Sequence, residues 1–538
     1  MAEEALPIVH ARVDNKQETQ DRVSRFASSS FTPSANPSLV HAFESLVVSR
    51  RGGVMIVGWI VDAESPIDHI AVVAREWSIT FDHSALARVR RIDAEEALGG
   101  QSIYSFGYFG FLFADEPVDP SGEFKVEICL KSGWTTTVTA MATVMGDSEL
   151  RNLVLTYLAG VQHFGNQQVQ AVACVDGGLG AEIIMHNRSI TDRIISSQYA
   201  ERFVSGNKRK PVGSIVVCLY GKSEYLFLQN CLFSGNPGIE DYEFIYICNS
   251  PELADSLLQE ARIATHLYDI DQTVVILPGN AGFGAANNVA VKHAQSDRIL
   301  IMNPDVFPYD LDWATKHTAI LKEAPAEQTK LFGAPLYYDN GSLMHGGMYF
   351  AIDKGPLRRR DRTAEWQLAR VEHYGKGAPP DAARFLKPRR VPAVTGAFMS
   401  CDRTWFEELG GFTEDYVFGH YEDADLCLKS IQAGTVPWIH NIKLWHLEGH
   451  GSTRLPVHEG GSIVNRWLFS ANWGPYISSN LLGPKPQHPA FRDQNTLASL
   501  NDEFSNANGV KPSVSKSKAV PAPQRETTKL SAKQTGTA

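Results

Sequence analysis

The stretch that decides the fold is residues 277–308, LPGNAGFGAANNVAVKHAQSDRILIMNPDVFP. It reads as a Gly/Asn-rich turn at 279–284, a short amphipathic helix, an apolar strand at 299–302 and then Asn-Pro-Asp. Open α/β proteins bind their ligands at the carboxyl edge of the sheet, and such a strand brings Asp305 to that edge. The free N–H groups at the start of the helix can receive an anion. This combination fits a nucleotide diphosphate with a divalent cation. The alternative is an ordinary loop, helix and strand with an acidic turn, which can have the same sequence.

The residues before this stretch alternate between apolar runs and helical patterns. SIVVCLY from residue 214 and YEFIYICN at 242–249 are continuous apolar runs, typical of strands buried on both faces. Helices are predicted at 223–233 and 251–264, and a further strand, VVILPG, at 274–279. The alternation predicts an α/β fold with a mostly parallel sheet and helices on both faces.

The residues after this stretch predict further strands at 331–352, with a turn at 339–341. Residues 353–388 are charged and punctuated by Pro and Gly, and they contain GPLRRRDR. We therefore predict a mobile loop over a site in this segment.

The composition is that of a globular protein with more than one domain. The length of 538 residues predicts roughly two to four domains, and 43% hydrophobic with 20% charged residues can build several cores. The formal net charge of -10 disfavours nucleic-acid binding. We find neither a signal-peptide pattern nor a run of about 18 apolar residues. The seven scattered cysteines lack a CxxC pair and predict reduced thiols in a cytoplasmic protein, with at most peripheral contact at the inner membrane face.

The chain divides into parts that differ in the character of their sequence. Short β segments separated by turn signals predict an antiparallel, Ig-like β-sandwich in the first half. Helical spacing and a basic run predict a helical linker between this domain and the α/β domain. Polar composition predicts a flexible segment at one end and a disordered tail at the other. The expected parts are 1–38 (flexible segment), 39–145 (β-sandwich), 146–210 (helical linker), 211–475 (α/β domain) and 485–538 (tail).

Two motifs in the second half carry candidate catalytic residues. VTGAFM places the small residues Gly396 and Ala397 where a ligand can approach closely, and YEDADLCLK places Glu422, Asp423 and Asp425 at the start of a predicted helix. Carboxylates at a helix N-terminus are usually caps, which explains one or two of them but three less well. A helix N-terminus lowers the pKa of a carboxylate, whereas neighbouring carboxylates raise it. One member of the cluster is therefore a candidate general base.

The segment WIHNIKLWHLEGHGS contains His440, His446 and His450. A lone histidine at the end of a strand is more often structural than a metal ligand. Together with Asp305, however, His446 becomes a candidate ligand of Mn²⁺ or Mg²⁺, since imidazole and carboxylate both suit Mn²⁺.

These motifs, in this order, resemble those of the family 2 glycosyltransferases with the GT-A fold, and most closely the bacterial rhamnosyltransferase-like branch. The matching elements are SIVVCLYGKSEYL, GNAGFGAANN, MNPDVFP in place of the DxD motif, VTGAFM, GGF, YEDADLCLK and HLEGHGS. No single motif is specific, but seven in the family's order are. The resemblance covers about residues 211–475 and leaves the N-terminal β-domain as an addition.

The resemblance implies an inverting transfer from a nucleotide-diphosphate sugar to a saccharide or lipid-linked saccharide acceptor, in bacterial surface or exopolysaccharide synthesis. The implied roles are catalytic base for Asp423, acceptor binding for Glu422, Gly396 and Ala397, metal ligation for Asp305 and His446, and donor binding for Tyr220, Asn249, Asn280, Gly282, Asn288 and Asn303.

Three departures from the family pattern leave details open. Asn249 stands where many members have an aspartate that contacts the base or ribose, so the nucleotide is not identified. Asn303 replaces the first acid of the DxD motif, which implies a modest affinity for metal. The family's HxxGxS pattern is one residue longer here, so His450 is the alternative metal ligand to His446.

Other functions fit these motifs less well. A dinucleotide-dependent oxidoreductase is disfavoured because GNAGFGAAN lacks the GxGxxG spacing and does not follow the first strand. A nucleotidyltransferase would need a basic Gly-rich loop after that strand, and LYGKSEYL is a poor version of one. The main alternative is a non-catalytic carbohydrate-binding protein with a degenerate transferase domain, against which Asp305, Asp423 and His446 weigh. The donor sugar, the acceptor and the oligomeric state, including a homo-oligomer, stay open.

Overall fold

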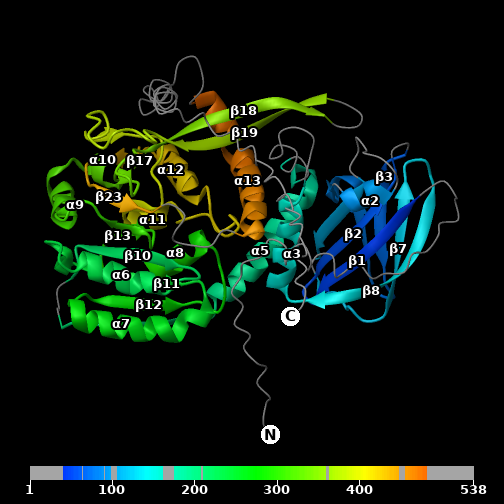
Figure 1. Cartoon of the computed structure of the whole chain (residues 1–538), viewed down its shortest axis with the longest axis horizontal. Coiled ribbons are helices and arrows are strands. Elements are labelled where there is room, and N and C mark those ends of the chain that lie inside the picture. The colour runs from blue at the N-terminus through cyan, green and yellow to red at the C-terminus, as the bar shows by residue number, and fades with distance from the viewer. Residues whose placement is uncertain are drawn as a thin grey trace, which may run out of the picture.

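The computed structural model describes residues 40–62, 65–89, 91–97, 106–114, 116–161, 172, 175–206, 210–358, 363–447 and 455–480. A β-rich N-terminal part (blue) and a larger α/β part (green to yellow) lie on either side of a layer of helices (Figure 1). That layer contains α3 (Asp147–Ala159), α5 (Gly180–Ile195) and α13 (Pro456–Asn480). The predicted flexible segment 1–38, the predicted tail 485–538 and His450 lie outside the described residues.

A nine-stranded sheet forms the centre of the α/β part. Its order is β20 (Arg389–Arg390), β22 (Trp438–Ile439), β15 (Leu331–Gly333), β21 (Phe398–Asp402), β13 (Arg298–Met302), β10 (Gly213–Leu219), β11 (Tyr242–Cys248), β12 (Gln272–Ile276) and β9 (Tyr199–Phe203). The central pairs β13–β10, β10–β11 and β11–β12 are parallel. β21 and β9 flank these strands in antiparallel orientation. The predicted α/β fold is confirmed, with its parallel strands at the centre of the sheet.

Helices cover both faces of this sheet. Every residue of β10 and β11 is buried, as expected from their continuous apolar runs. Successive side chains of a strand point to opposite faces, and the neighbours Val216 and Val217 accordingly belong to different core clusters. The cluster of Val216 includes α8 (Phe283–Val291) and α12 (Glu422–Gln432), and that of Val217 includes α6 (Glu224–Phe233), α7 (Ala254–Tyr268) and α9 (Trp313–Glu323).

A four-stranded sheet continues from the carboxyl end of β13. Its order is β14 (Val306–Pro308), β23 (Leu444–His446), β16 (Leu336–Tyr337) and β17 (Leu343–His345). Only the turn at 303–305 separates β13 from β14, so β23 is brought to the same edge. The shorter helices are α10 (Ala326–Thr329), α11 (Arg403–Glu408), η3 (Ile239–Asp241) and η4 (Pro251–Leu253).

The predicted mobile loop at 353–388 is in large part a strand pair. β18 (Met348–Arg358) and β19 (Thr363–His373) form a two-stranded ribbon that crosses α13 in Figure 1. The ribbon packs on this helix, where the Phe350 and Phe469 rings stack at 6.1 Å and the backbone N–H of Ala369 donates to Ser470 Oγ. The loop prediction was wrong for these residues, because cross-strand pairing and the cover of α13 outweigh their charged and Gly/Pro-rich composition.

The N-terminal strands form one curled sheet. Its order is β4 (Ser78–Asp82), β3 (Ile67–Val73), β7 (Glu123–Leu130), β8 (Thr135–Met145), β1 (His41–Ser49), β2 (Gly53–Ile60), β6 (Gly107–Phe113) and β5 (Leu86–Val89). Every pair is antiparallel except β1–β8, which is parallel. One core cluster contains residues from both ends of this order, Phe81 of β4 and Leu86 of β5. The expected two sheets of a sandwich are therefore joined in a single series in the described residues.

The other face of the curled sheet packs on the helical layer. Met55 and Phe109 share a core cluster with Leu150 of α3 and Ile183 of α5. The aromatic run of β6 is core, with Tyr108, Phe109 and Phe111 fully buried. The remaining short elements are α2 (Ile92–Ala97), η1 (His83–Ala85) and η2 (Val175–Leu179).

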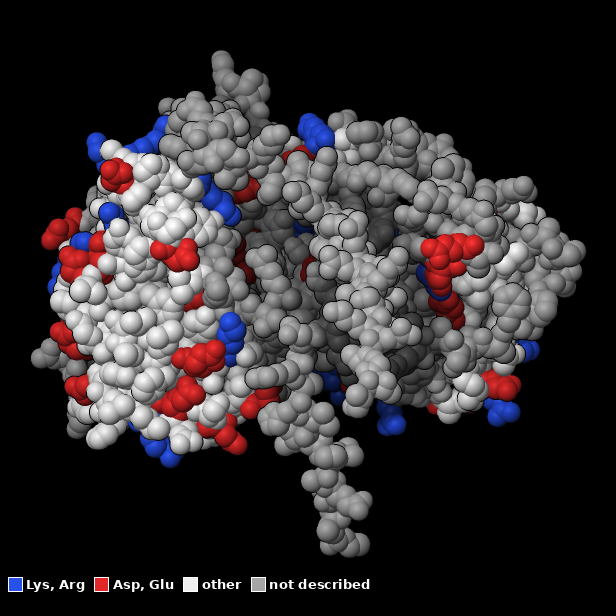
Figure 2. Space-filling view, viewed as in Figure 1, with Lys and Arg blue, Asp and Glu red and all other residues white. Residues whose placement is uncertain are grey.

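The surface of the described residues carries charges of both signs. On the face shown in Figure 2, Lys and Arg are scattered among Asp and Glu and form no continuous basic patch in the coloured part. Among the described residues, none of the helices combines the length and the apolar character needed to cross a bilayer.

Candidate active site

Asp305 and His446 meet at the carboxyl end of β13. His446 Nε2 lies 3.3 Å from Asp305 Oδ1, and both side chains are buried. The pairing of β14 with β23 sets this approach, because Val306 is the register partner of His446. The backbone N–H of Leu447 also donates to the Asp305 carbonyl at 3.0 Å. Two residues that are far apart in the sequence thus form one polar pair at the sheet edge where α/β proteins bind ligands.

The turn that carries Asp305 is tied to the acidic helix α12. The backbone N–H of Asn303 donates to the Ala397 carbonyl at 3.0 Å. One residue earlier, the backbone N–H of Gly396 donates to Asp423 Oδ2 at 2.9 Å. Gly396 and Ala397 therefore stand between Asp305 and Asp423 and hold the two carboxylates in a fixed relation.

A glutamine missed by the sequence reasoning also supports this turn. Gln229 Nε2 of α6 donates to the carbonyls of Asn303 (3.0 Å) and Val306 (3.3 Å), and the side chain is fully buried. Its signal in the sequence was a polar residue inside the apolar helix EYLFLQNCLF. A buried polar side chain requires a hydrogen-bond partner, which here is the turn below the candidate metal site.

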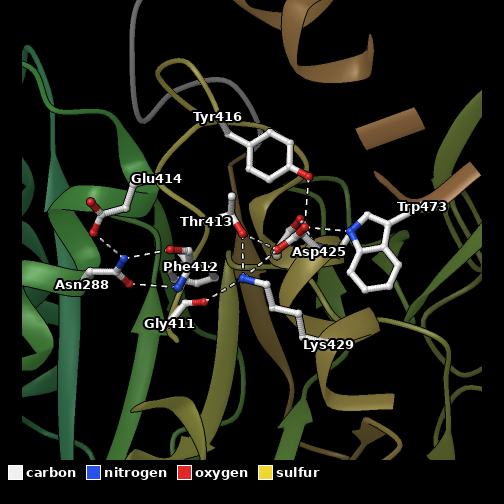
Figure 3. A network of polar contacts seen from close by, with 11 residues as sticks. Asn288, Gly411, Phe412, Thr413, Glu414, Tyr416, Asp425, Lys429 and Trp473 are labelled. Atoms are coloured by element: carbon white, nitrogen blue, oxygen red, sulfur yellow. Dashed lines mark hydrogen bonds and ion pairs between the residues drawn. The ribbon is translucent and has the colours of Figure 1, made fainter. Parts of the chain in front are cut away.

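Of the three acids at the start of α12, Asp425 is fully engaged in structural contacts. Its carboxylate accepts hydrogen bonds from Thr413 Oγ1 (2.6 Å), Tyr416 Oη (3.2 Å) and Trp473 Nε1 (2.7 Å), and it pairs with Lys429 Nζ at 3.0 Å (Figure 3). A buried carboxylate with this many partners holds loop 411–416 and α13 against α12. It is not free to accept a proton from a substrate.

Asp423 and Glu422 have fewer partners. Asp423 is partly exposed, and both its oxygens accept backbone N–H groups, Oδ2 from Gly396 (2.9 Å) and Oδ1 from Ala424 (2.7 Å). Glu422 is buried, and its Oε2 has no hydrogen-bond partner within the described residues. Burial raises the pKa of Glu422, and the neighbouring Asp423 raises it further. Burial likewise raises the pKa of Asp423, against the two N–H donors that lower it. A carboxylate of raised pKa near the surface suits a general base.

The backbone before α12 is strained. Phe418, His420 and Tyr421 have φ angles of 61°, 84° and 79°, in the left-handed region that side chains other than glycine rarely adopt. Asn465 of α13 holds this segment, because its side chain bonds the N–H and carbonyl of Val417 and the carbonyl of Gly419. Strained backbone that the surroundings enforce is common at functional sites. No residue type in the segment signalled this strain.

The strained segment lies against the Gly/Asn-rich turn. The backbone N–H of Phe283, at the start of α8, donates to the Phe418 carbonyl at 2.6 Å. Gly282 has φ 85°, and a Cβ there would lie 3.2 Å from Phe418 Cα. The turn is closed by Asn280, whose Oδ1 accepts the N–H of Gly282 at 2.9 Å.

Asn249 supports the same turn from below. Its Oδ1 accepts the N–H of Ala281 at 3.2 Å, and its Nδ2 donates to the Gly282 carbonyl at 3.1 Å. The side chain is buried. Both ends of the amide are therefore used to hold the turn, and a direct contact with a nucleotide stays a prediction.

Asn288 and Tyr220, both predicted to bind the donor, have different surroundings. Asn288 of α8 exchanges hydrogen bonds with the backbone of Phe412 at 2.9 Å and donates to Glu414 Oε1 at 2.8 Å, so it holds loop 411–414 against α8 (Figure 3). Tyr220 follows β10, is half-buried and stands edge-on to His458 at 5.9 Å. Of these two, only Tyr220 lies at the carboxyl edge where a nucleotide is expected.

The candidate metal site offers two protein ligands. Within the described residues, no group of three or more His, Cys, Asp or Glu side chains forms a metal-binding cluster. His446 Nδ1 is buried without a hydrogen-bond partner in this part of the chain, while Nε2 faces Asp305. Mg²⁺ and similar ions are commonly held by one or two carboxylates plus substrate phosphates. Asp305 and His446 fit a cation that is completed by a bound diphosphate.

One cavity in the described part of the chain is not lined by Asp305, Asp423 or His446. A hollow of about 360 Å³ opens between α5 and residues 410–415, and none of the predicted site residues lines it. Its lining includes Thr413 and Lys429, which belong to the contacts of Asp425. The chemistry is therefore assigned from the carboxylates at the sheet edge and not from this hollow.

Sequence comparison adds two distant relatives. No family model matches the chain. Over 223 residues, or 40% of this chain, it is 28% identical to an uncharacterized protein, y4gI, of Sinorhizobium fredii. Over 232 residues, or 41% of this chain, it is 24% identical to the O-antigen biosynthesis protein RfbC of Myxococcus xanthus. These matches span 22% of the first relative and 15% of the second.

Several glycosyltransferases of known structure align with this chain at low sequence identity. The mannosyltransferase PcManGT from Pyrobaculum calidifontis, in complex with GDP-Man and Mn²⁺, aligns with a TM-score of 0.32 and 13% sequence identity. The alignment covers 66% of this chain and 95% of that one.

Proposed function

We propose that the chain is an inverting glycosyltransferase of the GT-A type. It would move a sugar from a nucleotide-diphosphate donor to a hydroxyl of a saccharide or lipid-linked saccharide. The observation that carries this proposal is the arrangement around Gly396 and Ala397. Their backbone joins the turn of Asp305 to the carboxylate of Asp423, at the carboxyl edge of a parallel sheet. Sugar transfer needs a proton acceptor and a group that holds the diphosphate, and the arrangement connects a candidate for each.

Asp423 is proposed to act as the general base. It would take the proton of the acceptor hydroxyl as that oxygen attacks the anomeric carbon from the face opposite the diphosphate. Its partial exposure lets an acceptor reach it, and the Gly396 and Ala424 N–H groups hold the carboxylate in place. Glu422 is proposed to contact the acceptor. General-base catalysis of this kind contributes about 10²–10⁴-fold to the rate, and positioning supplies much of the rest.

Asp305 and His446 would hold the divalent cation. When bound, Mn²⁺ or Mg²⁺ neutralises charge on the diphosphate. The turn at 279–284 and the start of α8 would receive the donor, with Asn280 and Gly282 shaping the turn and Asn249 fixing it from below. The side-chain Nδ2 of Asn303 lies 3.4 Å from His446 Nε2. Asn303 would complete the part of the site that binds the donor.

The proposed setting is the synthesis of a bacterial surface polysaccharide or exopolysaccharide. The sequence match to the O-antigen biosynthesis protein RfbC supports this setting. The rhamnosyltransferase-like motifs also support it. We place the reaction in the cytoplasm, with peripheral contact at the inner membrane face if the acceptor is lipid-linked.

The test is donor hydrolysis by the purified full-length protein. UDP-, GDP- and dTDP-sugars are supplied with Mn²⁺, and release of the free nucleotide is measured. Release from one donor that is lost with EDTA and in the Asp305→Ala variant is the expected result. Binding of a saccharide without nucleotide binding or release from any donor would instead favour a non-catalytic carbohydrate-binding protein.

A further inference from the structure

A buried arginine of the helical layer lacks an acidic partner. Arg151 lies on α3, outside the α/β part, and its residue surface is only 4% exposed. Its Nη1 donates to Asn187 Oδ1 at 3.0 Å and its Nε to Asn152 Oδ1 at 3.4 Å. Within the described part of the chain, Nη2 donates no hydrogen bond and no carboxylate lies within 4.0 Å of the guanidinium. Both partners are neutral amides, so the charge itself is uncompensated.

The neighbours of Arg151 are the residues around the candidate donor turn. The guanidinium carbon lies 4.5 Å from the centre of the Phe418 ring. Phe418 is the strained residue whose carbonyl accepts the N–H of Phe283, and whose backbone faces Gly282. His458 joins this group, edge-on to Phe418 at 5.5 Å and to Tyr220 at 5.9 Å. Phe418 and His458 thus connect the arginine of the helical layer to the end of β10 and the start of α8.

Two other arginines of the helical layer, both on α5, have acidic partners. Arg188 of α5 binds the carboxylate of Asp415 with contacts of 2.5–2.9 Å, and Arg193 binds Asp147 at 2.6 Å. Arg188 is also largely exposed, at 58% of its side chain. The less exposed arginine is therefore the one without a counter-charge. That is the reverse of the usual rule that buried charges are paired.

Arg151 still carries a positive charge at neutral pH. Burial lowers its pKa to about 10, and the nearby Tyr220 opposes the shift. The Phe418 ring offers some stabilisation through its π face. An anion of the ligand would supply the missing charge, and the planar fork of arginine suits phosphate oxygens.

We propose that Arg151 binds a phosphate oxygen of the donor diphosphate, so that the N-terminal helical layer completes the nucleotide site of the α/β part. This inference rests on the proposed function. It assigns to the N-terminal region a direct part in donor binding, beyond a role as a packing or acceptor module.

The test compares nucleotide affinities of full-length variants. Binding of UDP, GDP and dTDP is measured by calorimetry with Mn²⁺, and binding of the matching nucleoside by ligand-detected NMR. Arg151→Met keeps an unbranched apolar side chain and removes the guanidinium and its charge, and we expect it to weaken diphosphate binding about 10- to 100-fold with nucleoside binding changed less than twofold. Arg188→Met is the matched control from the same layer, and it should leave both affinities within twofold of wild type.

Each outcome separates the two proposals. If the wild-type protein binds none of the diphosphates, the proposed function fails and Arg151 loses its ligand. If the wild-type protein binds one and Arg151→Met binds it equally well, only the Arg151 inference is overturned. An equal loss for nucleoside and diphosphate would assign Arg151 a structural role and also overturn it.

A second variant decides the case in which Arg151→Met does not fold, as judged by circular dichroism. Arg151→Lys keeps the charge but replaces the fork with a single point of contact. We expect it to bind the diphosphate three- to tenfold more weakly than wild type, with nucleoside binding unchanged. Wild-type diphosphate affinity in Arg151→Lys would overturn the inference.

Discussion

Asp423 and Asp425 lie two residues apart on α12, yet they belong to different regions of the molecule. Asp425 faces loop 411–416 and α13, where three side-chain donors and Lys429 occupy its oxygens. Asp423 faces the Gly396 turn, where the backbone N–H groups of Gly396 and Ala424 and the side chain of Thr395 hold it, and part of its surface is open. The same residue type on the same helix is thus buried and fully engaged in one region and partly exposed in the other. Partners, more than position in the helix, separate a structural carboxylate from a candidate catalytic one.

The largest effect should come from Asp423→Asn. The amide keeps the shape and can still accept the N–H of Gly396, but it cannot take a proton. We expect turnover to fall about 10²–10⁴-fold, with donor affinity within about threefold of wild type. Measurement of kcat and of nucleotide binding by calorimetry separates the two effects.

The matched control for this change is Asp402→Asn. Asp402 is also a carboxylate at the start of a helix, where it accepts the N–H of Trp405 at 2.9 Å and does nothing else that the site requires. Since asparagine is an equally good N-cap, turnover should stay near wild type. Joint loss of turnover and donor binding in Asp423→Asn would show that Asp423, too, is structural.

The opposite region should respond in stability. Asp425→Ala leaves the donors of Thr413, Tyr416 and Trp473 without their acceptor and removes the partner of Lys429. We expect the free energy of unfolding to fall by about 3–5 kcal/mol, the usual cost of removing one partner of a buried pair. Urea denaturation followed by fluorescence measures this change.

The control in the same loop is Asp415→Ala, which breaks the exposed pair with Arg188. Exposed ion pairs contribute about 0–1 kcal/mol. If the two variants lose similar amounts of stability, the distinction drawn between the regions fails.

The sequence predicted the sheet edge near Asp423 better than it predicted the contacts of Asp425. Continuous apolar runs are local signals, and they predicted the buried strands β10 and β11 and the edge to which Asp305 comes. The approach of His446 to Asp305 could be anticipated because both follow apolar strands in recognisable motifs. Local patterns of this kind place residues at the ends of strands, where candidate ligands gather.

The partners of amides and carboxylates could not be anticipated in the same way. Asn288 bonds the loop at 412–414, and Asp425 bonds Trp473, which lies 48 residues further along the chain. Many different polar groups could form hydrogen bonds with this amide and this carboxylate. Which partners they have depends on packing that no local pattern encodes. The same holds for the ribbon β18–β19, whose charged sequence forms strands because α13 covers it.

A smaller effect is expected at the contact between the donor turn and the strained segment. Gly282→Ala would place a Cβ 3.2 Å from Phe418 Cα at a φ of 85°. Together the φ penalty and the close contact should cost about 1–3 kcal/mol of stability. Donor affinity should fall as well, because the turn that receives the anion must shift. Thermal unfolding and calorimetry with the nucleotide measure the two changes.

Gly341→Ala provides the matched control. Gly341 has nearly the same φ, 83°, but a Cβ there meets nothing within 4 Å. It therefore carries the φ penalty alone and should leave donor affinity unchanged. Equal effects of the two substitutions would show that the contact with Phe418 does not matter.

The smallest effect, when it is expressed per pH unit, is a pH dependence of stability that originates in Glu422. Burial and the charge of Asp423 raise the pKa of Glu422 above its ordinary value of 4.5 in the folded protein. The folded state therefore keeps a proton that the unfolded chain has already lost. The stability from the protonated form is complete below pH 4.5 and is lost as the pH rises toward the raised pKa.

Glu422→Gln cannot lose a proton, so its free energy of unfolding should rise relative to wild type by at most about 1.4 kcal/mol per pH unit in this window. Urea denaturation between about pH 5 and pH 8 measures the difference, with the exposed Glu408→Gln as control. A flat difference would mean that Glu422 titrates as it does in the unfolded chain. The region around Asp423 would then lack the repulsion between neighbouring carboxylates that distinguishes it from the fully hydrogen-bonded Asp425.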